Sequence, residues 1–272
     1  MALELSTALS RQQPEGSLEL VNDEAIIVVK AAPRHSQTYG ETVCCAALDR
    51  DGHWVRLYPV SFRQLEDAQR FGRWDVVRYR WSKPKASKDT RTESRRVDPQ
   101  SIEIIKQLRQ SDRNPLLSRC AVSSLQKERE ENRSLALLRV EILDFWYESQ
   151  PLAEIQKREA ALDNLRRQND LFAPAALIPS RTCPYLFKYR YRDEDDIHVG
   201  TCQDWETEQT FFARLRDQES EQAALDWMLH KFGDEYPRRG MALAMGTHRY
   251  RADQWLINGV IRLNEEPQLS LL

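Results

Sequence analysis

The sequence predicts an α+β protein whose N-terminal domain is β-rich and barrel-like and whose C-terminal domain is α+β. Short apolar or alternating runs, separated by turn residues, fill the first half of the 272-residue chain. Helical periodicity is prominent after residue 150, and Pro174 and Pro179 bracket a linker-like stretch. We therefore divide the chain into a flexible arm (1–22), a β-rich domain (23–150), a helix with a linker (151–180) and an α+β domain (181–272).

A β-hairpin is the predicted centre of the N-terminal domain. Residues 42–48 are a short apolar run, residues 54–60 alternate apolar and polar side chains, and Gly52 between them can adopt the positive φ of a hairpin loop. With further strands at 24–32 and 73–81, these runs are expected to form one antiparallel or mixed sheet. The aromatic residues expected to be largely buried are Trp54, Tyr58, Trp74 and Trp255.

The rest of the first domain is less regular. Residues 62–69 favour a helical turn, and Asp98 followed by Pro99 is typical of a helix start. That helix would present Ile102, Ile105 and Leu108 on one face, and the pattern breaks at Asn114-Pro115. Residues 127–133 are a charged connection. Residues 135–147 are predicted to be a strand that closes the domain, with a helix through Leu138 and Ile142 as the alternative.

The C-terminal part alternates helices and strands. The expected elements are a surface helix at 152–167, a strand at 185–191, an acidic turn at 193–196, a returning strand at 197–202, helices at 204–215 and 220–232, and a strand pair at 241–247 and 254–263. Gly233 is predicted to end the second of these helices as its C′ residue. No internal repeat is visible in the sequence.

Charge is distributed unevenly along a chain whose net charge is −2. From residue 50 to 119, 17 Lys and Arg oppose 9 Asp and Glu, a difference of +8, whereas from 193 to 226, 11 acidic residues oppose 2 Arg, a difference of −9. This asymmetry indicates either a basic binding face with an acidic surface for a protein partner, or two regions that attract each other. Plain solvated surface is the third interpretation.

The location expected from the sequence is the cytoplasm. The five cysteines are an odd number and include the adjacent pair Cys44 and Cys45, which favours reduced thiols. The N-terminus lacks the basic and apolar regions of a secretory signal, and no stretch reaches the length of a membrane span. We expect neither a membrane association nor a cofactor.

The predicted hairpin resembles a family of uncharacterised prokaryotic proteins. These share a Gly-Glu-x-Val-Cys strand, here at 40–44, followed by a Trp-x-Arg-Leu-Tyr-Pro strand, here at 54–59. The likeness extends from about residue 25 to 262 through an Asp-x-Arg-x-Glu-Ser motif at 89–94, an Asp-Trp-Glu motif at 204–206 and Gly246-Thr247. Cys45 and Ala47 stand where Thr and Gly are usual. The resemblance attaches no established activity, although it suggests an association with DNA-modification or phage-defence genes.

A ribbon rich in basic and aromatic residues is the first candidate site. Cations could follow phosphates while aromatic rings stack on bases, which single strands and extruded bases require. The predicted nucleic-acid contacts are Arg56, Arg78, Tyr79, Arg80, Trp81, Lys83, Lys85, Lys88, Arg91, Arg95 and Arg96. Cations that keep an exposed strand soluble are the structural alternative.

A polar cluster within this ribbon is the second candidate. Asp89, Arg91 and Glu93 alternate, so on an extended strand they would share one face and either hold a polar ligand or form a structural ion-pair cluster. Arg56 is expected to be partly desolvated and paired with Asp89 or Glu93. Cys44 would be the nucleophile of an enzyme at this site, with Asp89 and Glu93 as acids, or else an inert core residue.

No metal site is predicted. Cys183, His198, Cys202 and His248 have suitable chemistry, but no pair has the short spacing of a zinc motif. Asp204 and Glu206 are acidic residues of the kind expected in a first helical turn, and a catalytic use would require His198 or His248 to approach them.

Three functions follow from these observations. The first is recognition of a nucleotide or base in nucleic acid, DNA more than RNA, through Arg and aromatic residues. The second is a hydrolase-type enzyme that acts on a nucleobase or small polar substrate through Cys44, Asp89 and Glu93. The third is a scaffold subunit that binds a protein through the acidic region 193–226.

Overall fold

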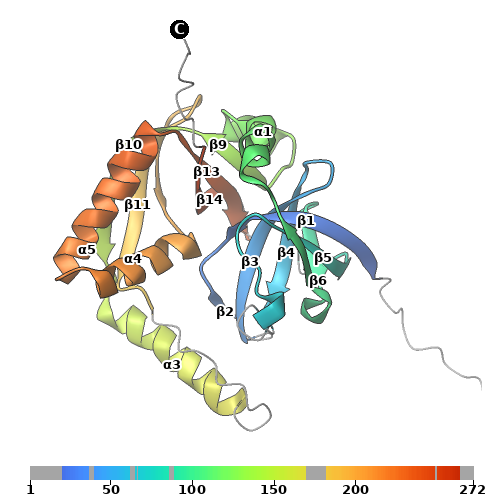
Figure 1. The fold of residues 1–272 in the computed structure, drawn as a ribbon, viewed down its shortest axis with the longest axis horizontal. Coiled ribbons are helices and arrows are strands. Elements are labelled where there is room, and N and C mark those ends of the chain that lie inside the picture. Colours follow the sequence, from blue (N-terminus) through green and yellow to red (C-terminus); the bar gives the residue numbers. More distant parts are fainter. Residues whose placement is uncertain are drawn as a thin grey trace, which may run out of the picture.

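The computed structural model describes residues 20–36, 40–61, 65, 67–85, 89–169, 182–248 and 250–263 (Figure 1). The elements up to residue 120 are β1 (Val21–Lys30), β2 (Arg34–Ser36), β3 (Gly40–Asp49), β4 (Trp54–Val60), η2 (Asp67–Gln69), β5 (Asp75–Ser82), β6 (Ser94–Val97), η3 (Pro99–Ser101), β7 (Glu103–Gln107) and α1 (Gln110–Cys120). They are followed by β8 (Ala121–Val122), α2 (Leu125–Glu130), β9 (Leu135–Arg139), β10 (Glu141–Ser149), α3 (Leu152–Asn169), β11 (Tyr185–Arg192), β12 (Ile197–Thr201), α4 (Trp205–Asp217), α5 (Glu221–Met228), the π-helical segment η4 (Leu229–Glu235), α6 (Tyr236–Arg238), β13 (Met241–His248) and β14 (Arg251–Arg262).

Five N-terminal strands close into a barrel. Their order is β1-β3-β4-β6-β5, and β5 returns to β1 from Val21 opposite Trp81 to Ile26 opposite Val76. Only the β4–β6 pair is parallel. Residues 21–26 of β1 pair with β5 and residues 25–30 pair with β3, and a bulge between Ile27 and Val29 interrupts the second pairing. The structure thus confirms the predicted α+β class with an N-terminal barrel, and the four predicted strands lie in one mixed sheet.

Strand alternation separates the inside of the barrel from its outer face. Val55 and Leu57 of β4 are 1% exposed and pack in the barrel core with Cys45, Val77 and other apolar residues. Because successive side chains of a strand point to opposite faces, Trp54, Arg56 and Tyr58 face outward. The four aromatic residues expected to be largely buried, Trp54, Tyr58, Trp74 and Trp255, are each half-buried.

The C-terminal strands follow the same cyclic order as the barrel. β9 and β10, separated only by Val140, pair with β13 and β11 respectively, and β12 lies beside β11. Cys202, just after β12, forms a parallel bridge to Ile257 of β14, and β14 pairs with β13. If β9 and β10 count as one kinked strand, the C-terminal order is β9/β10-β11-β12-β14-β13, and the barrel order is β1-β3-β4-β6-β5. Numbered along the chain, the strands of each part therefore follow the order first, second, third, fifth, fourth. This is a topological repeat that the sequence does not reveal.

A shared apolar cluster joins the two parts. Val28, Ala46 and Leu48 on the outer face of the barrel pack with C-terminal residues that include Leu135 and Ala244, all of them less than 9% exposed. Figure 1 shows the barrel beside the C-terminal strands, with α1 near the junction and α3 extending away from it. The junction therefore positions the outer face of β3 and β4 against the second unit.

Two predictions for residues 98–120 are wrong. Asp98 does cap a helical turn, since its side chain accepts a hydrogen bond from Gln100 N, but the turn is the short η3. The chain then continues as strand β7, which pairs with β5, so pairing at the sheet edge overrides the helical spacing of the apolar residues. Pro115 lies inside helix α1 and does not break it.

Further differences concern residues 125–147 and Gly233. Part of the charged connection is helix α2, and residues 135–147 form two strands that join the C-terminal sheets, so the helical alternative is wrong and they do not close the barrel. Gly233 lies within η4 instead of ending a helix. The other C-terminal helices and strands occur where they were predicted. The predicted linker at 174–179 and most of the N-terminal arm lie outside the described residues, as does part of the predicted turn at 62–69, where η2 is described.

Candidate functional site

The outer face of β3, β4 and β6 carries the candidate site. In the parallel pair, Arg56 lies opposite Ser94 and Tyr58 opposite Arg96, so the Tyr58 ring and the Arg96 guanidinium share one face. Tyr58 is half-buried, and its hydroxyl accepts a hydrogen bond of 3.4 Å from the Thr42 hydroxyl. Arg96 is exposed. An aromatic ring beside an exposed cation therefore lies on this face.

The loop from β5 to β6 borders this face with positive charge. Lys83 and Lys85 are exposed and, like Arg96, have no carboxylate partner among the described residues. Lys88 lies outside the described residues. An anion from solvent can therefore bind Lys83, Lys85 and Arg96 without displacing any carboxylate of the described residues.

Other cations and rings of the predicted ribbon are already engaged. Arg78 pairs with Glu24 at 2.9 Å and with Glu103 at 3.2 Å, and Arg80 pairs with Asp98 at 2.8 Å. The Arg95 guanidinium lies 4.1 Å from the centre of the half-buried Trp81 ring.

Tyr79 belongs to the barrel core. It is 0% exposed, its hydroxyl donates to Asp23, and burial raises the pKa of that hydroxyl. A fully buried ring offers no stacking surface, so Tyr79 is not part of the outer face on which a base could bind.

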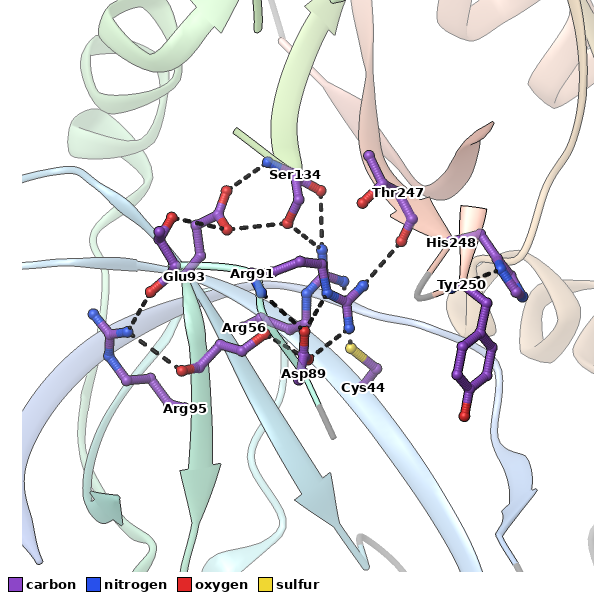
Figure 2. A network of polar contacts seen from close by, with 12 residues as sticks. Cys44, Arg56, Asp89, Arg91, Glu93, Arg95, Ser134, Thr247, His248 and Tyr250 are labelled. Carbon is purple, nitrogen blue, oxygen red and sulfur yellow. Dashed lines mark hydrogen bonds and ion pairs between the residues drawn. The ribbon is translucent and has the colours of Figure 1, made fainter. Parts of the chain in front are cut away.

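A buried network anchors the face to the C-terminal unit (Figure 2). Arg56 is 4% exposed, and its Nη2 donates to the carbonyl oxygen and the hydroxyl of Ser134 at 2.9 and 3.0 Å. Ser134 in turn donates to the Glu93 carboxylate from its backbone nitrogen at 2.5 Å and from its hydroxyl at 3.0 Å. We expected Arg56 to pair directly with Asp89 or Glu93. Among the described residues it instead shares a network with Glu93 through Ser134, which lies between them.

Asp89 and Arg91 form a second link to that unit. Arg91 donates to both Asp89 oxygens at 2.9 and 2.8 Å and to the carbonyl oxygen of Thr247 in β13 at 3.0 Å. Asp89, Arg91 and Glu93 lie in the loop before β6, so the prediction of one extended strand face is wrong. Burial raises the pKa of Asp89, but hydrogen bonds from Arg91 and Ser94 outweigh burial and lower it to about 2. Asp89 is thus an ionised acceptor near neutral pH.

Cys44 lies at the edge of this network. A bulge between Val43 and Cys45 lets the half-exposed Cys44 thiol approach Arg56, whose Nη1 lies 3.8 Å from the sulfur. Among the described residues, no histidine or carboxylate forms a hydrogen bond with Cys44. The enzyme interpretation, with Cys44 as nucleophile, therefore stays a prediction.

The four candidate metal ligands do not converge. His198 pairs with Asp193 at 3.0 Å, Cys202 contacts Thr207, and His248 accepts from Tyr250 N at 3.2 Å. Cys183 is buried. Within the described part of the chain, the one group able to hold a metal ion is Asp49, Asp51 and His53 at the β3–β4 turn.

Neither histidine approaches the Asp-Trp-Glu motif closely enough to bond. Asp204 caps α4 through Glu206 N, and both carboxylates contact Arg73.

The acidic region 193–226 is partly neutralised within the chain. Glu194 pairs with Lys127 at 2.9 Å, and Asp195 accepts from Ser124. The binding of a protein partner to this region stays a prediction.

Sequence analysis missed four contributors to the site. The sequence predicts a largely buried Tyr58, whereas Val55 and Leu57 inside the barrel require it to face outward, where it is half-buried. Ser134 and Thr247 are distant in sequence and gave no signal. Tyr250, at the β13–β14 turn beside the network in Figure 2, is 78% exposed.

Comparison with protein families gives two matches. A model described as domain of unknown function DUF8758 matches residues 21–120, and one described as domain of unknown function DUF8757 matches residues 115–272. Both are consistent with the predicted membership of an uncharacterised family. No curated protein matches the chain. No helix in the described ranges is both long and apolar enough to span a membrane.

Proposed function

We propose that this chain, which belongs to the family of domain of unknown function DUF8757, binds single-stranded nucleic acid on the outer face of its N-terminal barrel at Tyr58 and Arg96, beside the part of that face that packs against the C-terminal unit. The observation that carries the proposal is the position of Tyr58 and Arg96 on one strand face, beside Lys83 and Lys85, which have no carboxylate partner in the described part of the chain.

The strand connectivity supports this assignment. A five-stranded ring in the order first, second, third, fifth, fourth, with the third and fifth strands parallel, is the connectivity of the OB-fold. OB-folds bind oligonucleotides on the face of their second and third strands and through the loops between strands 1–2 and 4–5. Here that face belongs to β3 and β4, and the loop between the fourth and fifth ring strands is residues 83–93.

The chemistry of the face suits a single strand. A tyrosine ring stacks on any base, while Lys and Arg neutralise the backbone phosphates. The β13–β14 turn extends the face with Tyr250 and the exposed Arg251. Arg91 holds the end of β13 against the loop before β6. The proposed track therefore crosses from the barrel to the C-terminal unit.

Salt-dependent binding tests the electrostatic part. Fluorescence anisotropy would measure Kd for labelled single-stranded DNA, single-stranded RNA and duplex DNA over a range of salt concentrations. We expect the variant Lys83→Ala/Lys85→Ala/Arg96→Ala to reduce the slope of log K against log salt by about 2, at about 0.7 per lost phosphate contact. A matched control removes three exposed cations elsewhere, with the changes Lys106→Ala, Arg109→Ala and Arg119→Ala.

Tyr58 tests the stacking part. Tyr58→Leu should weaken binding by about 5- to 150-fold, since stacking on one base is worth roughly 1–3 kcal/mol. Tyr58→Phe keeps the ring and should bind within about twofold of wild type. The proposal is wrong if no nucleic acid binds, or if the control triple variant loses as much affinity as the Lys83/Lys85/Arg96 variant.

We also propose a cytoplasmic location, which the odd number of cysteines, five, supports. Measuring the distribution of the protein by cell fractionation checks it.

A further inference from the structure

A cavity of about 260 Å³ lies where the two family domains meet. None of its lining residues belongs to the proposed nucleic-acid face. Its walls come from Arg73 and Trp74 before β5, from α1, from the first turns of α4, from η4 and α6, and from β14. The cavity is thus a separate candidate site.

An ion cluster completes one wall. Arg73 donates to the Val260 carbonyl oxygen at 2.7 Å and pairs with Asp204 at 3.2 Å and with Glu206 at 3.0 Å. Asp204 is 2% exposed and also accepts hydrogen bonds from the backbone of Val260 and Glu206. The contacts of Arg73 therefore hold α4 against β14, and we assign Arg73 a structural role.

Two further guanidiniums face the cavity from different domains. The Arg113 guanidinium lies 5.2 Å from the Trp74 ring centre, and that of Arg262 lies 5.2 Å from the Tyr236 ring centre. Stacking on a ring leaves the in-plane N–H groups of a guanidinium able to donate hydrogen bonds. In Arg113, Nε and Nη2 donate to the Leu108 carbonyl oxygen at 3.3 and 3.2 Å and Nη1 donates to Gln110 Oε1 at 2.6 Å, so one further N–H on each Nη is available to a ligand. Arg262 is exposed and has no carboxylate partner within the described ranges.

The charge of the lining selects an anion. Three arginines, at 73, 113 and 262, oppose two carboxylates, at 204 and 206, a difference of +1. Arg73 pairs with both carboxylates, and the net charge of +1 that remains on the lining is available to a ligand at Arg113 and Arg262. Paired guanidiniums match the oxygens of a phosphate, which accepts bidentate hydrogen bonds.

Two departures from regular backbone geometry adjoin the same cavity. Trp74 has φ of 73°, which is uncommon for a residue other than glycine, and hydrogen bonds of 2.7 Å to Ile27 and from Leu108 hold it there. The π-helical η4 contributes Phe232. Such irregularities concentrate at binding sites because they fix side chains in place.

We propose that this cavity binds a small organic phosphate, about the size of a sugar phosphate or nucleoside monophosphate, through Arg113 and Arg262. Gln110 and Thr210 also line the cavity. Gln110 Oε1 accepts from Arg113 and the Thr210 hydroxyl donates to the Glu206 carbonyl oxygen, so the Gln110 amide nitrogen can donate to the ligand and the Thr210 oxygen can accept from its hydroxyls. Because Arg113 lies in α1 and Arg262 in β14, the bound phosphate ties the two family domains together.

Thermal unfolding of the full chain tests this inference. The probes are inorganic phosphate, ribose 5-phosphate and AMP, with ribose and adenosine as uncharged counterparts. At ligand concentrations about 100-fold above Kd, a phosphorylated probe should raise Tm by roughly 5 °C, whereas the uncharged counterparts should not. Isothermal titration calorimetry then gives Kd.

Matched variants identify the site. Arg262→Ala removes an exposed side chain and should weaken binding by about 10- to 150-fold with the unliganded Tm unchanged, and Arg113→Ala should act in the same direction. Arg238→Ala, an exposed change on α6, should keep the full shift. The variant Lys83→Ala/Lys85→Ala/Arg96→Ala should keep it too, which separates this site from the nucleic-acid face. The inference is overturned if no phosphorylated probe binds at millimolar concentration, or if Arg262→Ala binds like wild type.

Discussion

Replacing Asp89 with asparagine tests the electrostatic link between the barrel and the C-terminal unit. Asp89 accepts hydrogen bonds from the side chains of Arg91 and Ser94, and Arg91 reaches across to Thr247. The Asp89→Asn side chain is neutral and would leave the Arg91 charge without its partner. The change is isosteric, so it creates no cavity.

The magnitude follows from the pKa of Asp89. The carboxyl group has a pKa of about 2 in the folded protein against an ordinary value of 3.8. One pKa unit corresponds to about 1.4 kcal/mol, so the ionised form stabilises the fold by about 2 kcal/mol. Because the folded pKa is depressed, this contribution is complete above about pH 4 and is lost as the pH falls through 2. About half of it remains at pH 3.

Urea unfolding followed by tryptophan fluorescence measures the effect. At pH 7 the Asp89→Asn variant should lose at least about 2 kcal/mol, and at pH 3 this difference should shrink by about 1 kcal/mol. The penalty for the unpaired Arg91 does not depend on pH in this range, since arginine stays charged. Asp253→Asn, at an exposed position, should change the stability by less than about 0.5 kcal/mol at either pH. A difference between Asp89→Asn and wild type that is the same at both pH values would refute the reasoning.

Three further changes probe other parts of the structure. Arg56→Met should lower the free energy of unfolding by about 3 kcal/mol, because it removes the donor to the buried Ser134 oxygens and one of the cations near the buried Glu93. A loss below about 1 kcal/mol in urea denaturation would contradict this. Gly259→Ala places a Cβ 2.6 Å from Val29 Cγ2, so it should lower the free energy of unfolding by roughly 1–3 kcal/mol and lower Tm in calorimetry. An unchanged Tm would contradict this and would show that Val29 can move to accommodate the methyl group. Cys44→Ser should leave oligonucleotide affinity within about twofold of wild type, and a tenfold loss in anisotropy would place the thiol in the binding surface. If the enzyme interpretation holds, Cys44→Ser abolishes turnover instead.

Local alternation was sufficient to predict most strands but not the way they assemble. The side chains of β4 alternate, and that pattern is present in the sequence whatever the neighbouring strand is. Ring closure instead depends on pairs such as Val21 with Trp81, which no short window of sequence contains. For the same reason the helical spacing of Ile102, Ile105 and Leu108 was misleading, because β5 pairs with this segment as a strand.

The candidate site was predictable to a similar extent. Clustered charge identified Lys83, Lys85 and Arg96, and these cations are indeed exposed. It could not show that Arg78 is neutralised, because the partner Glu24 lies on another strand of the ring. The need to compensate Arg56 predicted a polar network, yet Ser134, 78 residues further along the chain, could not be identified from spacing.

The residues of the junction network between the barrel and the C-terminal unit are synthesised at different times, because the chain is made from its N-terminus. All five ring strands lie between residues 21 and 97, so ribosomal synthesis supplies the complete ring before Ser134 exists. Until then Arg56 lacks the acceptors that Ser134 provides, and the apolar residues Val28 and Leu48 lack their C-terminal cover. We therefore expect the nascent barrel to expose apolar surface and to be prone to aggregation until the second half of the chain packs against it. We therefore expect the two family domains not to fold independently of each other.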